Sequence, residues 1–167
     1  METTQPTLEK RVLVADDDEM IRALLDRFLT KHNYFVQVLT DGNEALDYLQ
    51  KTEPSKHPKV ILMDNDVGET RCVGLNALEK IKQIYNHDIS VIMMSGSPCL
   101  PDGSSLEEAA KNKGAVGFVE KPFNLDMLLE KVNACYQETV EKRTSVYVAP
   151  AQASQETQAI PTSPASP

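Results

Sequence analysis

Residues 60–66 read VILMDND, in which four consecutive aliphatic side chains run directly into Asp64. Such a run, without polar alternation, is typical of a strand in a parallel sheet, because both faces of that strand are buried. Similar β-branched or aliphatic runs occur at 12–15, 34–39, 91–94 and 117–119. The sequence therefore predicts five short strands within residues 10–136.

Segments with apolar residues at helical spacing separate these strands. The apolar residues of the first such segment are Met20, Ile21, Leu24, Leu25, Phe28 and Leu29. Residues that commonly cap helices precede three later segments, namely Thr40-Asp41, Ser104-Ser105 and Asn124. Five successive β-α units predict an α/β fold: a flavodoxin-like, doubly wound, five-stranded parallel sheet in the order 2-1-3-4-5, with helices on both faces.

The composition excludes several classes of function. The 167 residues hold 17 Lys and Arg against 25 Asp and Glu, a formal net charge of −8, which argues against binding to nucleic acid or to an anionic membrane. No apolar run approaches the ~20 residues of a membrane span, and no secretion signal is visible. The 3 cysteines lie far apart, without the spacing of a zinc site or a disulfide framework. We therefore expect a cytoplasmic protein.

The two ends of the chain differ from its middle. Residues 1–9 are polar, and we expect them to be flexible, ahead of one patterned domain over residues 10–136. Residues 137–167 are expected to hold the end of the last helix and a disordered tail rich in Pro, Ser, Thr, Ala and Gln. From Thr144 onward the only charge is Glu156, and the apolar content is too low to offset the entropy of ordering.

Polar side chains follow four of the five predicted strands. In strand order they are Asp16-Asp17-Asp18, Asp64, Ser95 and Lys121. Ligands of open α/β sheets bind at the carboxyl ends of the strands, so we expect these side chains to gather at one rim. Crowded carboxylates repel one another unless a cation such as Mg²⁺ neutralises them, and Asp64 could then attack phosphorus. An Asp run alone is more often a helix cap, so the prediction depends on the combination.

Four segments resemble the motifs of response-regulator receiver domains: VLVADDDEMIRALL (12–25), VILMDND (60–66), VIMMSGS (91–97) and GAVGFVEKPF (114–123). They occur in the family's order, and the resemblance covers about residues 10–136. It implies that Asp64 accepts a phosphoryl group from a histidine kinase or a histidine phosphotransferase, and that a switched surface binds a downstream protein target. Such a chain is a phospho-acceptor switch that catalyses only its own phosphorylation and dephosphorylation, not an enzyme.

The resemblance also implies a set of Mg²⁺ ligands. Asp17 would bind the ion directly, Asp16 through water, Asp64 by its carboxylate and Asp66 by its backbone carbonyl. The family's Met-Pro step after the phosphorylated residue is absent, and the run 65–74 looks longer by a couple of residues. Asp66 also takes one of two variable positions that tune loss of the phosphoryl group in the family.

The implied switch residues are Ser95 and Phe118. Ser95 would close on the phosphoryl group together with Lys121, whose bond to Pro122 is cis in the family. Phe118 would swing inward and report the change at the surface of the last strand and the last two helices. Ser97 takes the second variable position. Because the segment 97–105 is long and holds two prolines, we expect the following helix to start late and to be short.

Two other interpretations stay open. Asp64-Asn65-Asp66 also resembles the Asp-x-Asp motif of haloacid-dehalogenase-type phosphatases, although in that family the nucleophile follows the first strand. A receiver-like module that is never phosphorylated and binds a partner constitutively is the second alternative.

We expect a single-domain regulator, either a phosphorelay intermediate or an adaptor, because no output domain is visible after Tyr136. The histidine donor is expected to dock on the first helix and on the loop after the fifth strand. The residues expected in this docking surface are Arg22, Leu25, Leu29 and Pro122.

Overall fold

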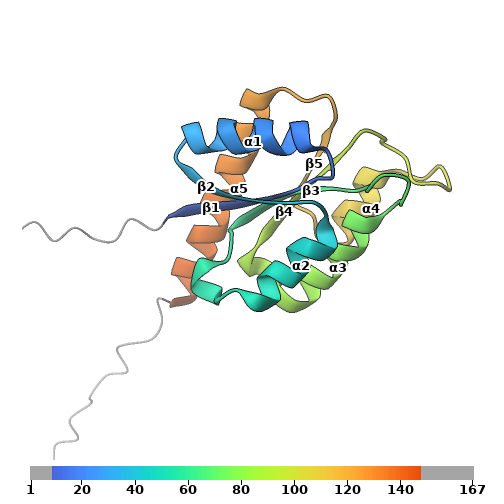
Figure 1. Cartoon of the computed structure of the whole chain (residues 1–167). Helices are drawn as coiled ribbons and strands as arrows, with labels where there is room; N and C mark the ends of the chain where they lie inside the picture. The colour runs from blue at the N-terminus through green and yellow to red at the C-terminus, as the bar shows by residue number, and fades with distance from the viewer. Residues whose placement is uncertain (1–8, 148–167) are drawn as a thin grey trace, which may run out of the picture.

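The computed structural model describes residues 9–147, in which strands and helices alternate along the chain (Figure 1). The strands are β1 (Lys10–Ala15), β2 (Tyr34–Leu39), β3 (Val60–Asp64), β4 (Ser90–Ser95) and β5 (Gly117–Glu120). The α-helices are α1 (Glu19–Lys31), α2 (Gly42–Lys51), α3 (Val73–Tyr85), α4 (Leu106–Asn112) and α5 (Leu125–Tyr147). Short 3₁₀ turns, η1 (Pro54–Lys56) and η2 (Asn86–Asp88), precede β3 and β4.

All five strands form one parallel sheet in the order β2-β1-β3-β4-β5, which confirms the predicted topology. β3 lies at the centre, with Val60 in register with Val12 on one side and with Ser90 on the other. Every residue of β3 and β4 is buried, as the uninterrupted apolar runs predicted. This order places the ends of β1 and β3 side by side, next to the end of β4.

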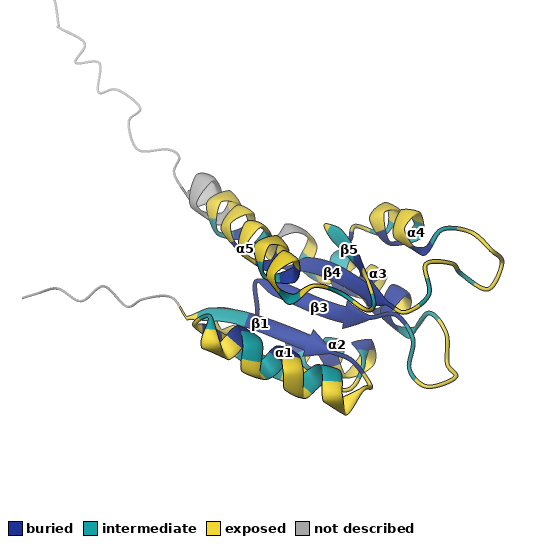
Figure 2. Ribbon diagram, turned by 90° about the horizontal axis from the view of Figure 1, so that it is seen from above, coloured by how far each residue is buried: buried dark blue, intermediate teal, exposed yellow. Residues whose placement is uncertain are grey.

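Two separate hydrophobic cores lie on the two faces of the sheet. One core joins the sheet to α2, α3 and α4 and includes Leu13, Ile61 and Leu78; the other joins it to α1 and α5 and includes Leu62 and Leu25. Figure 2 shows the buried strands between helices whose outer faces are exposed. Successive residues of one strand point to opposite faces, so β3 contributes to both cores.

The predicted capping residues occupy the helix starts. Asp18 accepts hydrogen bonds from the amides of Met20 and Ile21 at the start of α1. Asp41 and Ser105 cap α2 and α4 in the same way, and Asn124 Oδ1 accepts from two amides of the first turn of α5. Each capped start fixes where the preceding loop ends.

Leu25 and Leu29, which we expected in the docking surface of α1, are fully buried in the core instead. The expectation was wrong because the two residues, one turn apart, lie on the face of α1 that packs against the sheet. The exposed large apolar side chains of α1 are Met20 and Leu24, with 81% and 44% of their surface accessible.

The last helix continues through Tyr147, past Thr144, where we expected the polar tail to begin. The expected flexible start and disordered tail fall largely on residues 1–8 and 148–167, which lie outside the described residues. Among residues 9–147, none of the helices combines the length and the apolar character that a membrane crossing requires.

Gly74, the second residue of α3, brings this helix directly against the end of β3. Its amide donates to the carbonyl of Asn65 at 2.9 Å. A Cβ atom at this position would lie 2.1 Å from the backbone oxygen of Asp64, a distance that no packing rearrangement of side chains can relieve. The missing side chain of Gly74 therefore helps to set the position of Asp64.

We expect Gly74→Ala to lower the free energy of unfolding by about 3 kcal/mol, because the added methyl group must push α3 away from β3. Urea denaturation followed by circular dichroism measures the change. Gly96→Ala is the matched control: a Cβ at Gly96 meets nothing within 4 Å, so a change of no more than about 0.5 kcal/mol is expected. Equal stabilities of the two variants would contradict the prediction.

Candidate functional site

The ends of the strands bring three carboxylates together at one rim of the sheet. Asp16 and Asp17 follow β1, and Asp64 is the last residue of β3. One oxygen from each lies within 4.8 Å of the others, an arrangement able to hold a metal ion. Asp16 and Asp64 are buried, whereas Asp17 is exposed and leaves the cluster open to solvent. The structure thus gathers the acidic residues that the sequence placed at separate strand ends.

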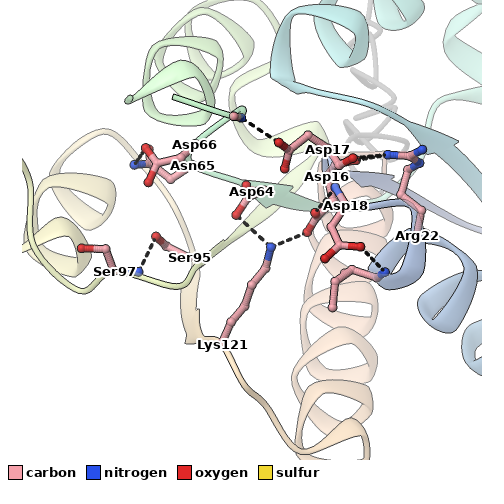
Figure 3. A network of polar contacts seen from close by, with 12 residues as sticks. Asp16, Asp17, Asp18, Arg22, Asp64, Asn65, Asp66, Ser95, Ser97 and Lys121 are labelled. Carbon is pink, nitrogen blue, oxygen red and sulfur yellow. Dashed lines mark hydrogen bonds and ion pairs between the residues drawn. The ribbon is translucent and has the colours of Figure 1, made fainter. Parts of the chain in front are cut away.

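Lys121, directly after β5, partly compensates the charge of this cluster (Figure 3). Its Nζ lies 2.6 Å from Oδ2 of Asp16 and 3.0 Å from Oδ1 of Asp64. The backbone amide of Lys121 donates to the carbonyl of Ser95 at 2.8 Å, and the bond to Pro122 is cis, as the resemblance implied. One ammonium group thereby bridges two buried carboxylates that would otherwise repel each other.

Burial raises the pKa of Asp64 to about 6, even though the Lys121 ammonium lowers the pKa and only partly offsets that effect. Asp16 and Asp17 add smaller contributions that also raise the pKa. The ionised form of Asp64 is therefore less favourable in the folded protein than it would be in water. A group that adds positive charge at the rim would reduce this difference.

Backbone amides orient the other two carboxylates. The amide of Asp18 donates to Oδ1 of Asp16 at 3.0 Å, and the amide of Gly68 donates to Oδ2 of Asp17 at 2.7 Å. Gly68 was not among the residues that the sequence singled out. It lies in the segment between β3 and α3 and has a φ of +52°, a left-handed conformation that favours glycine.

The segment between β3 and α3 is a small hairpin, closed by reciprocal backbone hydrogen bonds between Val67 and Thr70. The carboxylate of Asp66 stabilises the base of this hairpin. It accepts hydrogen bonds from the amide of Cys72 at 3.1 Å and from the guanidinium of Arg71 at 3.1 Å. It also accepts from the side chain of Asn65, toward which it is turned in Figure 3. The side chain of Asp66 therefore stabilises the conformation of this loop. Its backbone carbonyl stays a predicted ligand of Mg²⁺.

Ser95 and Phe118 lie near the rim on β4 and β5. The hydroxyl of Ser95 is buried and accepts from the amide of Ser97 at 3.1 Å. Phe118 is partly buried and packs against the core on the α2–α4 face. The segment after β4 delays α4 until Leu106 and leaves it 7 residues long, so the expected late and short helix is confirmed.

Comparison with known proteins agrees with this geometry. Residues 12–133 match the family model of the response regulator receiver domain. The chain is 31% identical over 129 residues to the response regulator MprA of Mycolicibacterium vanbaalenii, covering 77% of this chain and 51% of that protein. It is 35% identical over 123 residues to the response regulator RR06 of Streptococcus pneumoniae, covering 74% of this chain and 51% of that protein. The chain thus spans about half the length of these curated relatives.

Solved structures show the same fold. A response regulator receiver domain protein (CheY-like) from Methanospirillum hungatei superposes with a TM-score of 0.67 at 26% identity, over 80% of this chain and 98% of that chain. The superposition therefore includes nearly all of the solved domain.

We expect Asp64→Asn to stabilise the protein in the absence of divalent ions, by about 1–3 kcal/mol at pH 7. The folded-state pKa of about 6 lies above the unfolded value, so between about pH 4 and pH 6 the folded state holds a proton that the unfolded chain has lost. Stability is then lost as the pH rises through this window, and the stabilisation by asparagine shrinks as the pH falls from 7 toward about 4. Urea denaturation in EDTA at several pH values measures it; a pH-independent difference would contradict the prediction.

Proposed function

The chain belongs to the response regulator receiver domain family, and from this we propose that it accepts a phosphoryl group on Asp64 from a phosphohistidine donor. Receiver-domain phosphorelay signalling follows from membership; the donor, the acceptor residue and the outcome are parts of the proposal. The donor is a histidine kinase or a histidine phosphotransferase. The outcome is a change in a surface that binds a downstream protein.

The observation that carries the proposal is the meeting of Asp16, Asp17 and Asp64 around one point, with Lys121 bridging two of them. Three carboxylate oxygens within 4.8 Å form a hard, oxygen-only donor set, which suits Mg²⁺. We propose that these three residues hold the ion, together with the backbone carbonyl of Asp66. When bound, Mg²⁺ neutralises charge on the carboxylates and on the transferred group.

The transfer itself needs few protein groups. A carboxylate oxygen of Asp64 attacks the phosphorus atom of the phosphohistidine, the P–N bond breaks, and the electron pair stays on the departing imidazole nitrogen. Lys121, already 3.0 Å from the attacking carboxylate, stabilises the negative charge spread over the phosphoryl oxygens. The structure thus supports a mechanism based on positioning and charge compensation.

The phosphoryl group adds a charge of about −1.5 to −2 and three acceptor oxygens at the end of β3. Ser95, at the end of β4, accepts from the amide of Ser97 through its hydroxyl oxygen, and its O–H group can turn to donate to a phosphoryl oxygen. We propose that this movement, with that of Lys121, favours an inward position of Phe118 and changes the surface of α4, β5 and α5.

The order of the site residues along the chain argues against the phosphatase, and the acidic cluster argues against the unphosphorylated binding module. A haloacid-dehalogenase-type phosphatase would place its nucleophile after the first strand, whereas Asp64 ends β3, the third strand in sequence. A receiver that is never phosphorylated would need no acidic cluster, yet oxygens of Asp16, Asp17 and Asp64 lie within 4.8 Å of one another, and Lys121 contacts Asp16 and Asp64. Both considerations favour the phospho-acceptor.

A groove beside α1 offers a docking surface for the histidine donor. It has a volume of about 710 Å³ and is lined by residues of α1, including Leu24 and Phe28, and by Leu125 at the start of α5. Leu24 is 44% exposed and thus takes the role that we first expected of Leu25. We propose that an amphipathic helix of the donor covers these apolar side chains.

We expect Asp64→Asn to abolish phosphorylation by acetyl phosphate or by a phosphorylated histidine phosphotransferase in the presence of Mg²⁺, because the attacking carboxylate is lost. Intact-mass spectrometry detects the phosphoryl group. Asp18→Asn is the matched control, since asparagine also caps helices and Asp18 lies outside the acidic cluster. Absence of a phosphoryl group on the unchanged chain with every donor would favour the constitutive binding module.

For the docking surface, Leu24→Asp is expected to slow transfer from a histidine phosphotransferase by about tenfold or more, because a charge is placed in an apolar contact. Phosphorylation by acetyl phosphate, which needs no docking, should keep its rate. Ile84→Asp is the control: Ile84 is 55% exposed on α3, across the sheet from α1. Equal transfer rates for the two variants, measured by quenched-flow phosphorimaging, would exclude this groove as the docking site.

A further inference from the structure

Arg22 reaches back from α1 to the loop that carries the acidic pair (Figure 3). Its Nη1 atom donates to the backbone carbonyl of Asp16 at 2.7 Å and to that of Asp17 at 2.9 Å. A guanidinium Nη atom carries two hydrogens in a fixed plane, so a single nitrogen can serve both carbonyls. The sequence suggested Arg22 only as a docking residue, a role that these contacts do not require.

The restraints on Asp16 and Asp17 differ. The carboxylate of Asp16 is buried and held by both Lys121 and the amide of Asp18. The carboxylate of Asp17 is exposed, and its hydrogen bond is to the amide of Gly68. Gly68, which belongs to the hairpin between β3 and α3, therefore restrains the side chain of Asp17. The backbone of Asp17 is restrained from α1 by the hydrogen bond that Arg22 donates to its carbonyl.

We propose that Arg22 is a positioning residue that fixes the peptide groups of Asp16 and Asp17, so that their carboxylates converge on Asp64 as Mg²⁺ ligands. The proposal rests on the proposed function, since it concerns the same site. Groups that orient metal ligands without touching the metal commonly change its affinity about 10- to 100-fold when they are removed.

The test is the Mg²⁺ affinity of the unphosphorylated full chain, measured by isothermal titration calorimetry at neutral pH. Arg22→Gln loses the charge, and its amide nitrogen lies two atoms nearer the backbone than Nη1, too short to serve both carbonyls. We therefore expect the Mg²⁺ dissociation constant of this variant to rise at least about tenfold. Arg22→Lys keeps the charge on a shorter, more flexible side chain, so its affinity is expected to lie between those of Arg22→Gln and the unchanged chain. Thermal denaturation verifies that each variant is folded at the titration temperature.

Lys80→Gln on α3 is the matched control, because Lys80 is exposed and its loss changes the net charge by the same amount. An affinity of Arg22→Gln within about twofold of the unchanged chain, or an equal loss in Lys80→Gln, would overturn the positioning role. If Arg22→Gln does not fold, Arg22→Lys carries the test, and an affinity equal to that of the unchanged chain overturns the proposal. Failure of the unchanged chain to gain a phosphoryl group would instead overturn the proposed function, whatever the affinities show.

Discussion

The bridge from the Lys121 ammonium to the carboxylates of Asp16 and Asp64 is the interaction on which this rim depends. Two buried carboxylates would repel each other strongly in a medium of low polarity, and an unpaired buried charge is costly. Lys121 removes much of that repulsion but leaves Asp64 with a raised pKa. The carboxylates of this rim are thus partly paired within the protein, and further positive charge there would still be favourable.

Much of the fold and the core of the site were predictable from local signals. Uninterrupted aliphatic runs such as Val60–Met63 located the strands, and alternation with helices led to the strand order that the structure shows. Because parallel strands end at the same edge, Asp16, Asp64 and Lys121 could be placed together without any knowledge of side-chain positions. These predictions succeeded because they needed only periodicity and chain direction.

Other features depend on tertiary geometry that periodicity does not contain. The apolar residues of α1 include both Leu24 and Leu25, and the spacing alone did not decide which of them faces the sheet. In the hairpin between β3 and α3, the Asp66 side chain accepts a hydrogen bond from the amide of Cys72 and so stabilises its own loop. The same hairpin brings the amide of Gly68 to the carboxylate of Asp17, a residue 51 positions away. In the sequence, Gly68 indicates a turn in that loop, but it does not indicate that its amide binds Asp17.

The membership of β3 in both hydrophobic cores has a mechanical consequence. Leu62 packs with the α1 and α5 layer while Ile61 and Met63 pack with the layer of α2, α3 and α4, and all three are inaccessible to solvent. Densely packed interiors resist displacement, so this strand cannot translate when charge accumulates at its tip. If a phosphoryl group is added there, we therefore expect the adjoining loops, rather than the central strand, to change position.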